Sequence, residues 1–419
     1  MDVVTLGESM VTFLPGRPGR LADVPSFDRA IGGAESNVAC ALAAFGHTAR
    51  WVSRVGADGF GDHLVERIAG YGVDVSAVRR DPDRPTGVYF RTAGDRGTGA
   101  HEVAYYRAGS AASAMSTRNV DLAAVRAARV LHLSGITAAL SDTCLDLLRA
   151  LTAPGPDRPL VSFDVNHRPG LWRTAEGPRV LLEVARHADV VFVGEDEAEQ
   201  AWGVTGGPEA IRGVLPEPGV VVVKQGERGA TAFAGPGRST DADRGRATAS
   251  RPSAPSPTAP PLTAASPAAL PPAALPLTAA PPTETSAAAP PPPETSPGAL
   301  PPTAASPTGA SPTGASPTAA PHAFEPALRT AVVATTGAGD AFAAGFLSAT
   351  LRGLPLRTRL RHGHLFAAAA LTAPGDLAPP PARDHADRLA ALDAGAWGRL
   401  RLGPGWTQAD RATEEANHP

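Results

Sequence analysis

The chain reads Thr335-Thr336-Gly337-Ala338-Gly339-Asp340 directly before a run of small and apolar residues at 341–347. Glycines let backbone N–H groups approach an anion without interference from a Cβ atom. The first turn of a helix adds unpaired N–H donors and the positive end of the helix dipole. The motif therefore predicts a helix start that binds a phosphoryl group.

The carboxylate of Asp340, in the same turn, is the candidate general base. It can accept the proton of an acceptor hydroxyl while the backbone N–H groups of 337–339 stabilise charge on the transferred phosphoryl group. An acidic residue also occurs in a first helical turn for structural reasons alone, since it stabilises the helix by roughly 0.3 kcal/mol or more. The rest of the sequence has to decide between these two interpretations.

Composition narrows the class of protein. The 38 basic and 41 acidic residues nearly cancel and form no basic run, which argues against a nucleic-acid binder. No apolar run reaches the roughly 18 residues of a membrane span, and the N-terminal residues lack the pattern of a signal peptide. The sequence therefore predicts a soluble, cytoplasmic protein whose partner is a small molecule, with no nucleic acid and no membrane.

The segment 237–321 is rich in Pro, Ala, Thr and Ser, with near-repeats. Dense proline removes backbone donors and disfavours helix, and few large apolar side chains remain to offset chain entropy. We therefore predict a disordered insertion in one folded domain made of 1–236 and 322–419. A glycosylated stalk or a ligand for proline-binding domains is the alternative that this composition allows.

Apolar runs at 130–133, 160–163, 189–193 and 220–224 alternate with helical patterns. Continuous apolar strands separated by helices are typical of an α/β fold with a mainly parallel sheet flanked by helices. We expect one more strand at 331–334, directly before the glycine motif. Ligands of such folds bind beyond the carboxyl ends of the strands. The distinctive polar and glycine residues follow such ends: Asp164, Asn166, Arg168, Glu197, Gly226, Gly229 and 337–340.

Two segments, 9–27 and 85–107, show alternation and turn residues without helical periodicity. They predict a small β-sheet outside the main layer. Such a lid can close over a sugar and exclude water, and its open face can serve as a contact between subunits. We therefore expect a homo-oligomer that forms through the β lid.

Several motifs together resemble the ribokinase-like (PfkB) carbohydrate kinases. The first signature of that family resembles 32–39, with Gly46 and 53–61, and the second resembles 335–340. Within the family, the 2-keto-3-deoxygluconate kinases are the most similar group. That similarity rests on the motifs at 85–87, 105–107, 109–113, 132–136 and 163–168.

The resemblance implies a role for each matching residue. Asp340 would deprotonate the terminal hydroxyl of the sugar, and Gly337, Ala338 and Gly339 would form the anion hole for the γ-phosphoryl group of ATP. The keto-acid would be held by Gly33, Asn37, Tyr89, Tyr105, Arg107 and Arg168. Arginine also suits this substrate chemically, because its guanidinium forms a fork on a carboxylate. The nucleotide side would be lined by Lys224, Gly226, Gly229, Thr335 and His364, and Mg²⁺ would be held by Glu197.

The chain departs from the family pattern at three positions. Ala334 replaces an Asp that often takes part in a monovalent-cation site, and Gly194 replaces the Asn of a motif from which Glu197 remains. Water can replace that amide, because Mg²⁺ usually keeps several waters. His364 stands near a position where an Asn often borders the adenine.

The function expected from the resemblance is phosphorylation of 2-keto-3-deoxygluconate to its 6-phosphate, dependent on ATP and Mg²⁺. A kinase for a neutral sugar or nucleoside, such as ribose, fructose or adenosine, is the alternative among enzymes. An alternative of another class is a non-catalytic sugar or nucleotide sensor whose Pro-rich segment recruits partners.

Overall fold

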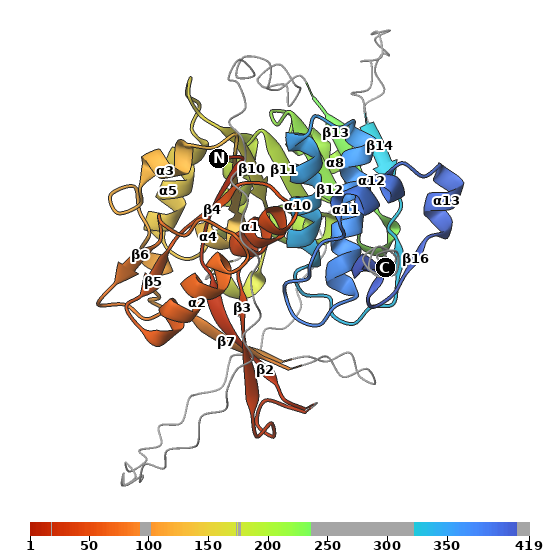
Figure 1. Ribbon diagram of the computed structural model, residues 1–419. Helices are drawn as coiled ribbons and strands as arrows, with labels where there is room; N and C mark the ends of the chain where they lie inside the picture. The colour runs from red at the N-terminus through yellow and green to blue at the C-terminus, as the bar shows by residue number, and fades with distance from the viewer. Residues whose placement is uncertain (18, 93–101, 173, 175–176, 236–321, 409–419) are drawn as a thin grey trace, which may run out of the picture. The chain divides into compact units, whose positions relative to one another are not determined.

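The computed structural model describes residues 1–17, 19–92, 102–172, 174, 177–235 and 322–408, so the predicted disordered insertion at 237–321 lies outside them. An eight-stranded sheet forms the centre of the described part (Figure 1). The strand order is β14 (His322–Glu325), β13 (Ala230–Ala234), β12 (Val220–Lys224), β11 (Val190–Gly194), β10 (Leu160–Asp164), β9 (Val130–Ser134), β1 (Val3–Leu6) and β4 (Ala49–Val52). The strands from β12 to β4 are parallel and β13 and β14 are antiparallel, so the predicted fold class is confirmed.

Alternate residues of each central strand point to opposite faces of this sheet, which is why the strands are apolar throughout. Val190 and Phe192 of β11 join one buried cluster and Val191 and Val193 join the other. One face packs on α3 (Leu122–Arg126), α5 (Asp142–Thr152), α6 (Val180–Arg186), α7 (Glu195–Trp202) and α8 (Gly207–Val214). The other packs on α1 (Ala34–Ala44), α10 (Ala338–Leu351), α11 (Leu356–Leu371), α12 (Arg383–Ala390) and α13 (Ala394–Arg399).

Helix α10 is held closely against α11, because glycines remove side chains at the contact. A Cβ atom at Gly345 would lie 2.3 Å from the carbonyl oxygen of His362, and one at Gly363 would lie 2.8 Å from the ring of Phe342. Residues Phe342–Leu351 of α10 are buried. The helix start that carries Asp340 is therefore fixed by the core behind it.

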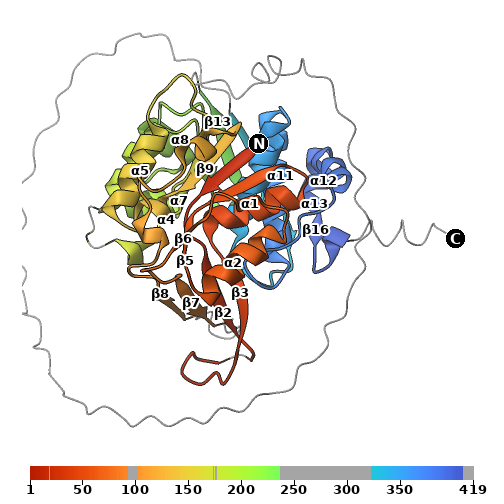
Figure 2. The same cartoon turned by 60° about the vertical axis from the view of Figure 1, so that its left-hand side comes forward.

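A separate four-stranded sheet has the order β3 (Phe27–Gly32), β2 (Met10–Pro15), β7 (Val88–Arg91) and β8 (Val103–Tyr106). Its strands lie together, away from the central sheet, in Figures 1 and 2. The predicted small sheet is thus confirmed, although β3 extends beyond the predicted segment 9–27. Strands β5 (Arg54–Gly56) and β6 (Arg79–Asp81) form a parallel pair next to α2 (Gly59–Ala69).

The expected strand at 331–334 is wrong. The strand found nearby is β15 (Arg329–Thr330), which pairs with β16 (Arg401–Leu402) and not with the central sheet. The N–H groups of Val333 and Ala334 donate to the carbonyl oxygen of Leu371 at the end of α11. These two N–H groups therefore do not pair with a strand of the central sheet. Val332 and Val333 are exposed, so the apolar run does not mark a buried strand here.

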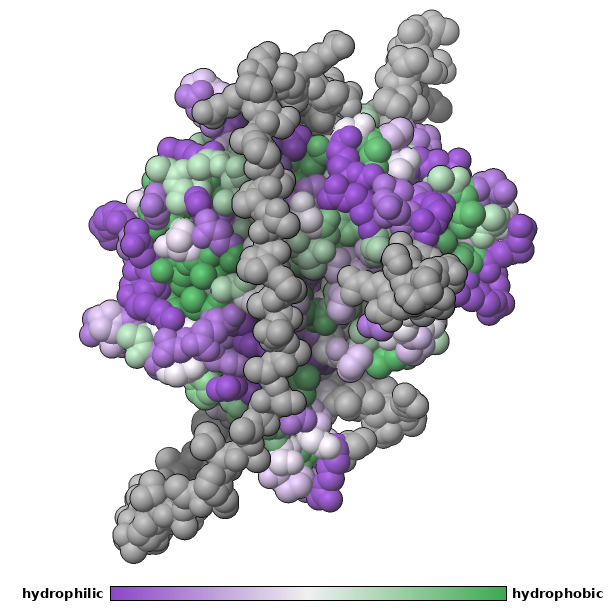
Figure 3. All heavy atoms as spheres, viewed as in Figure 1, coloured by the Kyte–Doolittle hydropathy of each residue, from purple (hydrophilic) through white to green (hydrophobic). Residues whose placement is uncertain are grey.

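No helix among the described residues combines the length and hydrophobicity that a bilayer crossing requires. On the face shown in Figure 3, hydrophilic residues predominate over α12 and α13, with apolar residues scattered between them.

Candidate active site

Polar residues meet where the central parallel strands end. The register pairs Ser134 of β9 with Asp164 of β10, and Gly194 of β11 with Lys224 of β12. Neighbouring parallel strands place their carboxyl ends at one edge, where ligands of α/β folds bind. The residues singled out after these strands therefore share one edge of the sheet, as the sequence predicts.

Asp340 lies at this edge, in the first turn of α10. The side-chain Nδ2 of Asn37, from α1, donates a hydrogen bond of 2.9 Å to its Oδ2 atom. Burial raises the pKa of Asp340 to about 7, assisted by the charge of Asp164, while the hydrogen bond from Asn37 opposes the shift. A carboxyl that ionises near neutral pH and keeps partial access to solvent suits a general base.

The helix start at 337–339 begins with a glycine cap. Gly337 caps the helix with a φ of 79°, a left-handed conformation that favours glycine. A Cβ atom there would lie 2.2 Å from the carbonyl oxygen of Asp376, so the loop also needs glycine for close packing. The first-turn N–H groups of Ala338 and Gly339 have no partner within the helix and can face a phosphoryl group.

Lys224 lies between two carboxylates at the same edge. Its Nζ atom is 3.0 Å from Oδ1 of Asp164 and 3.5 Å from Oε2 of Glu197. Burial alone would lower the pKa of Lys224, but the two carboxylates outweigh it and raise the pKa above its ordinary value. The ammonium therefore remains charged.

Glu197 is the predicted magnesium ligand, and its carboxylate is already shared. Its Oε2 accepts from the backbone N–H of Gly194 at 2.6 Å, and its Oε1 lies 3.8 Å from Nη1 of Arg168. Among the described residues, no three Asp, Glu, His or Cys side chains gather as a metal site. A single carboxylate still fits Mg²⁺, provided that phosphate oxygens and water complete the shell.

The predicted sugar-binding residues of the lid lie together. The ring centroids of Tyr89 and Tyr105 are 5.5 Å apart, and the guanidinium of Arg107 lies 5.8 Å from the Tyr105 ring. Arg107 pairs with the buried carboxylate of Glu8, which also accepts from the hydroxyl of Ser110. Much of the positive charge of Arg107 is therefore cancelled within the protein.

Gly33 and Arg168 complete this set from the main domain. Gly33 caps α1, and a Cβ atom there would lie 2.6 Å from the carbonyl oxygen of Glu8, so it is a glycine for close packing. Arg168 is about half exposed and lies near enough to Asp340 to lower its pKa. Asn166, two residues before it, has a φ of 39°, which is uncommon for a residue other than glycine.

Of the residues predicted for the nucleotide side, two are brought together, while Lys224 lies with Asp164 and Glu197. Gly229 and His364 meet at one backbone carbonyl, that of Glu325: a Cβ atom at Gly229 would lie 2.2 Å from it, and Nε2 of His364 is 3.0 Å away. The His364 ring is buried, which lowers its pKa to about 4. Gly226 begins the turn after β12 with a φ of 59°, and Thr335 is exposed.

Sequence reasoning missed three buried acids around the site. Glu8 pairs with Arg107, Glu35 accepts from the hydroxyls of Ser134 and Thr137 at 2.7 Å, and Asp376 accepts from the hydroxyl of Tyr89. Only Glu35 had a signal, since it lies between Gly33 and Asn37 in the first signature. Glu8 and Asp376 contact partners about 100 or more residues away in the sequence, so no local pattern predicts these contacts.

Arg91 of the lid strand β7 connects to the glycine loop through Asp376. Its Nη2 lies 2.6 Å from Oδ1 of Asp376, both side chains are nearly buried, and its Nη1 donates to Oγ1 of Thr336 at 3.2 Å. Removing one partner of a buried pair leaves an uncompensated charge, which costs about 3 kcal/mol or more. We expect Arg91→Gln to lower the free energy of unfolding by about that amount in urea denaturation.

The matched control is Arg29→Gln, an exposed residue of β3 in the same sheet, which should change stability by less than about 0.5 kcal/mol. Adding Asp376→Asn to Arg91→Gln should recover part of the loss, because it removes the orphaned carboxylate. Equal losses in Arg91→Gln and Arg29→Gln would contradict this account.

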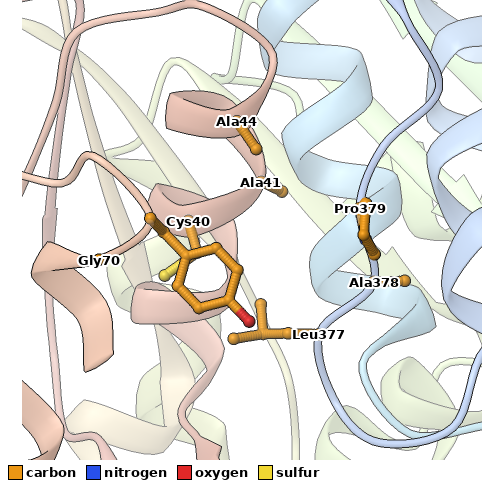
Figure 4. Close-up of a pocket in the computed structure, with 8 residues that line it drawn as sticks. Cys40, Ala41, Ala44, Gly70, Leu377, Ala378 and Pro379 are labelled. Carbon is orange, nitrogen blue, oxygen red and sulfur yellow. The ribbon is translucent and has the colours of Figure 1, made fainter. Parts of the chain in front are cut away.

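A further cavity of about 290 Å³ lies between α1 and the loop 377–379 (Figure 4). Its lining is mostly small and apolar: Cys40, Ala41, Ala44, Gly70, Tyr71, Leu377, Ala378 and Pro379. None of these residues belongs to the groups described above.

Comparisons with known proteins show which family this chain is similar to. The family described as pfkB family carbohydrate kinase matches residues 1–245 and 313–383. The chain is 36% identical over 237 residues to a 2-dehydro-3-deoxygluconokinase of Thermoproteus tenax, which covers 56% of this chain and 72% of that protein. It is 34% identical over 205 residues to fructokinase-1 of Oryza sativa subsp. japonica, covering 48% and 62%.

A solved structure extends the similarity over most of the fold. The PfkB protein from Polaromonas sp. JS666 superposes with a TM-score of 0.62 at 27% sequence identity. The match covers 88% of this chain and 95% of that one.

Proposed function

The chain belongs to the pfkB family of carbohydrate kinases, and we propose that it phosphorylates a small sugar acid, 2-keto-3-deoxygluconate (2-dehydro-3-deoxygluconate). The products would be 2-keto-3-deoxy-6-phosphogluconate and ADP. The similarity to the 2-dehydro-3-deoxygluconokinase of Thermoproteus tenax supports this substrate.

One observation carries the proposal: Asp340, with a pKa of about 7, stands in the first turn of α10 and is held by Asn37. Base and anion-binding N–H groups therefore belong to one helical turn. The Oδ1 atom of Asn37 is buried without a partner among the described residues, so it is available to a hydroxyl of a bound sugar.

In the proposed reaction, Asp340 accepts the proton of the terminal hydroxyl as the oxygen attacks the γ-phosphorus of ATP. A bond forms between that oxygen and phosphorus, and the bond from phosphorus to the β–γ bridging oxygen breaks, so ADP leaves with its electron pair. The N–H groups of Ala338 and Gly339 stabilise charge on the transferred group, because they are fixed before the reaction starts.

We place the nucleotide beside Gly226, Gly229, Thr335 and His364, near the carbonyl of Glu325. When bound with ATP, Mg²⁺ would supply neutralisation of phosphate charge, and Glu197 is the residue that would hold it. The remaining shell would come from phosphate oxygens and water.

The two arginines support an acidic substrate unequally. Arg107 is buried against Glu8, whereas Arg168 is about half exposed and only 3.8 Å from Glu197. We therefore propose Arg168 as the main partner of the substrate carboxylate, with Arg107 and the two lid tyrosines shaping the pocket.

A kinase for a neutral sugar is the second candidate. It is favoured by the cancelled charge of Arg107 and by the similarity to a fructokinase of Oryza sativa. Such a site would bind the substrate through hydroxyl contacts alone, and Arg168 would then be free of a substrate carboxylate.

A substrate panel separates these candidates. We expect kcat/KM, measured by ATP consumption, to be at least about tenfold higher for 2-keto-3-deoxygluconate than for fructose, ribose or adenosine, because one charged hydrogen bond contributes about 1.5–3 kcal/mol. A higher kcat/KM for a neutral sugar would overturn the proposal that 2-keto-3-deoxygluconate is the substrate. The absence of turnover with every compound would favour a sensor.

We also propose that 1–236 and 322–419 form one catalytic domain, which is supported by a family match that omits 246–312.

We propose in addition that the chain forms a homo-oligomer through the lid. It is supported by β8, an edge strand whose Val103, Tyr105 and Tyr106 are exposed, since such edges readily pair with another chain.

A further inference from the structure

Lys224 is the only lysine in the chain. Of the 38 basic residues, the other 37 are arginines. The one lysine lies at the carboxyl end of β12. Lysine carries a compact ammonium with three donors, while arginine carries a broad planar fork.

The ammonium lies close to two carboxylates and to the start of α10. Nζ lies 3.0 and 3.2 Å from the two carboxylate oxygens of Asp164 and 3.5 Å from Glu197. On another side is the first turn of α10, where a Cβ atom at Gly339 would be 3.8 Å from Nζ. The ammonium is thus enclosed by two acids and the proposed anion hole.

The ammonium therefore lies beside the helix start that would hold the transferred group, while the backbone of Lys224 pairs with Ala230, the residue after Gly229. Asp340, the proposed base, follows Gly339 directly, whereas Gly229 and His364 lie at Glu325. A phosphoryl group bound at the start of α10 would lie near the carboxylates of Asp164 and Glu197. The repulsion between these negative charges and the phosphoryl group would oppose binding if no cation lay between them. Lys224 both offsets those acids and offers a donor on the side of the helix start.

We propose that Lys224 is a catalytic residue whose compact ammonium contacts the phosphoryl group during its transfer. This inference rests on the proposed function. In a loose transition state, charge spreads over the three equatorial oxygens of the phosphoryl group, so a fixed donor that faces them lowers the barrier. Lys224 then stabilises the same charge as the N–H groups of Ala338 and Gly339, from another direction.

The test compares Lys224→Met with Lys224→Arg. We expect Lys224→Met to lower kcat about 10²–10³-fold, the usual effect of losing one such donor, while the KM for ATP stays within about threefold. Lys224→Arg keeps a cation between Asp164 and Glu197 but displaces it, so kcat should fall about tenfold. The control Arg149→Met removes a cation from an exposed pair with Glu183 on the far helix α5 and should leave kcat unchanged.

The outcomes are decisive in both directions. A kcat of Lys224→Met within threefold of the unaltered chain, or a higher KM for ATP at unchanged kcat, would overturn the inference, since the latter indicates a contact with bound nucleotide only. If Lys224→Met does not fold, Lys224→Arg decides alone: a lower kcat at constant KM supports the inference and an unchanged kcat overturns it. If the unaltered chain phosphorylates no sugar, the proposed function fails instead.

Discussion

Asp340→Asn is expected to lower kcat by about 10²–10⁴-fold, the range that a general base contributes. The amide keeps the size and the hydrogen-bonding shape of the carboxyl but cannot accept the proton of the sugar hydroxyl. Steady-state kinetics with 2-keto-3-deoxygluconate and ATP measure the effect. Turnover within a few-fold of the unaltered chain would remove the proposed mechanism.

The pH dependence distinguishes a base from a structural acid. For the unaltered chain, kcat/KM should rise with pH through about 7, because the base must be ionised in the free enzyme and burial places its pKa there. The remaining activity of Asp340→Asn should lack this limb. Asp142→Asn is a matched control, since Asp142 lies in the first turn of α5 on the surface, and it should change neither kcat nor the pH profile.

Stability provides a check that the variant is folded. Burial raises the pKa of Asp340 from 3.8 to about 7, so the folded chain holds the extra proton between those values and stability falls as pH rises through that window. Above pH 7 the unaltered chain carries the full cost of the buried charge, which Asp340→Asn removes. The Tm of the variant should therefore gain more over the unaltered chain at pH 8 than at pH 5.

Periodicity and glycine motifs predicted the layers of the fold because both are local signals. The strands β9 to β12 and the small lid sheet lie where apolar runs and alternation placed them. The error at 331–334 is instructive. An apolar run of four residues cannot be distinguished from a loop by period alone. Here the N–H groups of Val333 and Ala334 bond to Leu371, and Val332 and Val333 are exposed.

In the candidate site, too, local motifs were predictable from the sequence and tertiary contacts were not. The sequence placed Asp340 and Asn37 in two separate signatures, and the structure joins them by a direct hydrogen bond. The contacts of Arg107 with Glu8 and of Arg91 with Asp376 could not be predicted, because no local pattern links residues that meet only through tertiary packing. They leave Arg168 more exposed than Arg107, which is why we propose Arg168 as the partner of the substrate carboxylate.

Arg168→Gln should therefore change substrate choice more than any other arginine variant. Its guanidinium is about half exposed and only weakly paired, so it can form a fork on a carboxylate. Losing a charged hydrogen bond of about 1.5–3 kcal/mol should lower kcat/KM for 2-keto-3-deoxygluconate by about 10–10²-fold. Values for fructose and ribose should change little, so the ratio of acid to neutral substrate falls.

Arg107→Gln is the control variant for the prediction about Arg168→Gln. It leaves the carboxylate of Glu8 buried and unpaired, so the main loss should appear in Tm and not in the substrate ratio. Arg168→Lys keeps the charge without the fork and should fall between Arg168→Gln and the unaltered chain. The prediction would be contradicted if the ratio of acid to neutral substrate were unchanged in Arg168→Gln but collapsed in a fully stable Arg107→Gln. Arg107 would then be the residue that binds the substrate carboxylate, despite its pairing with Glu8.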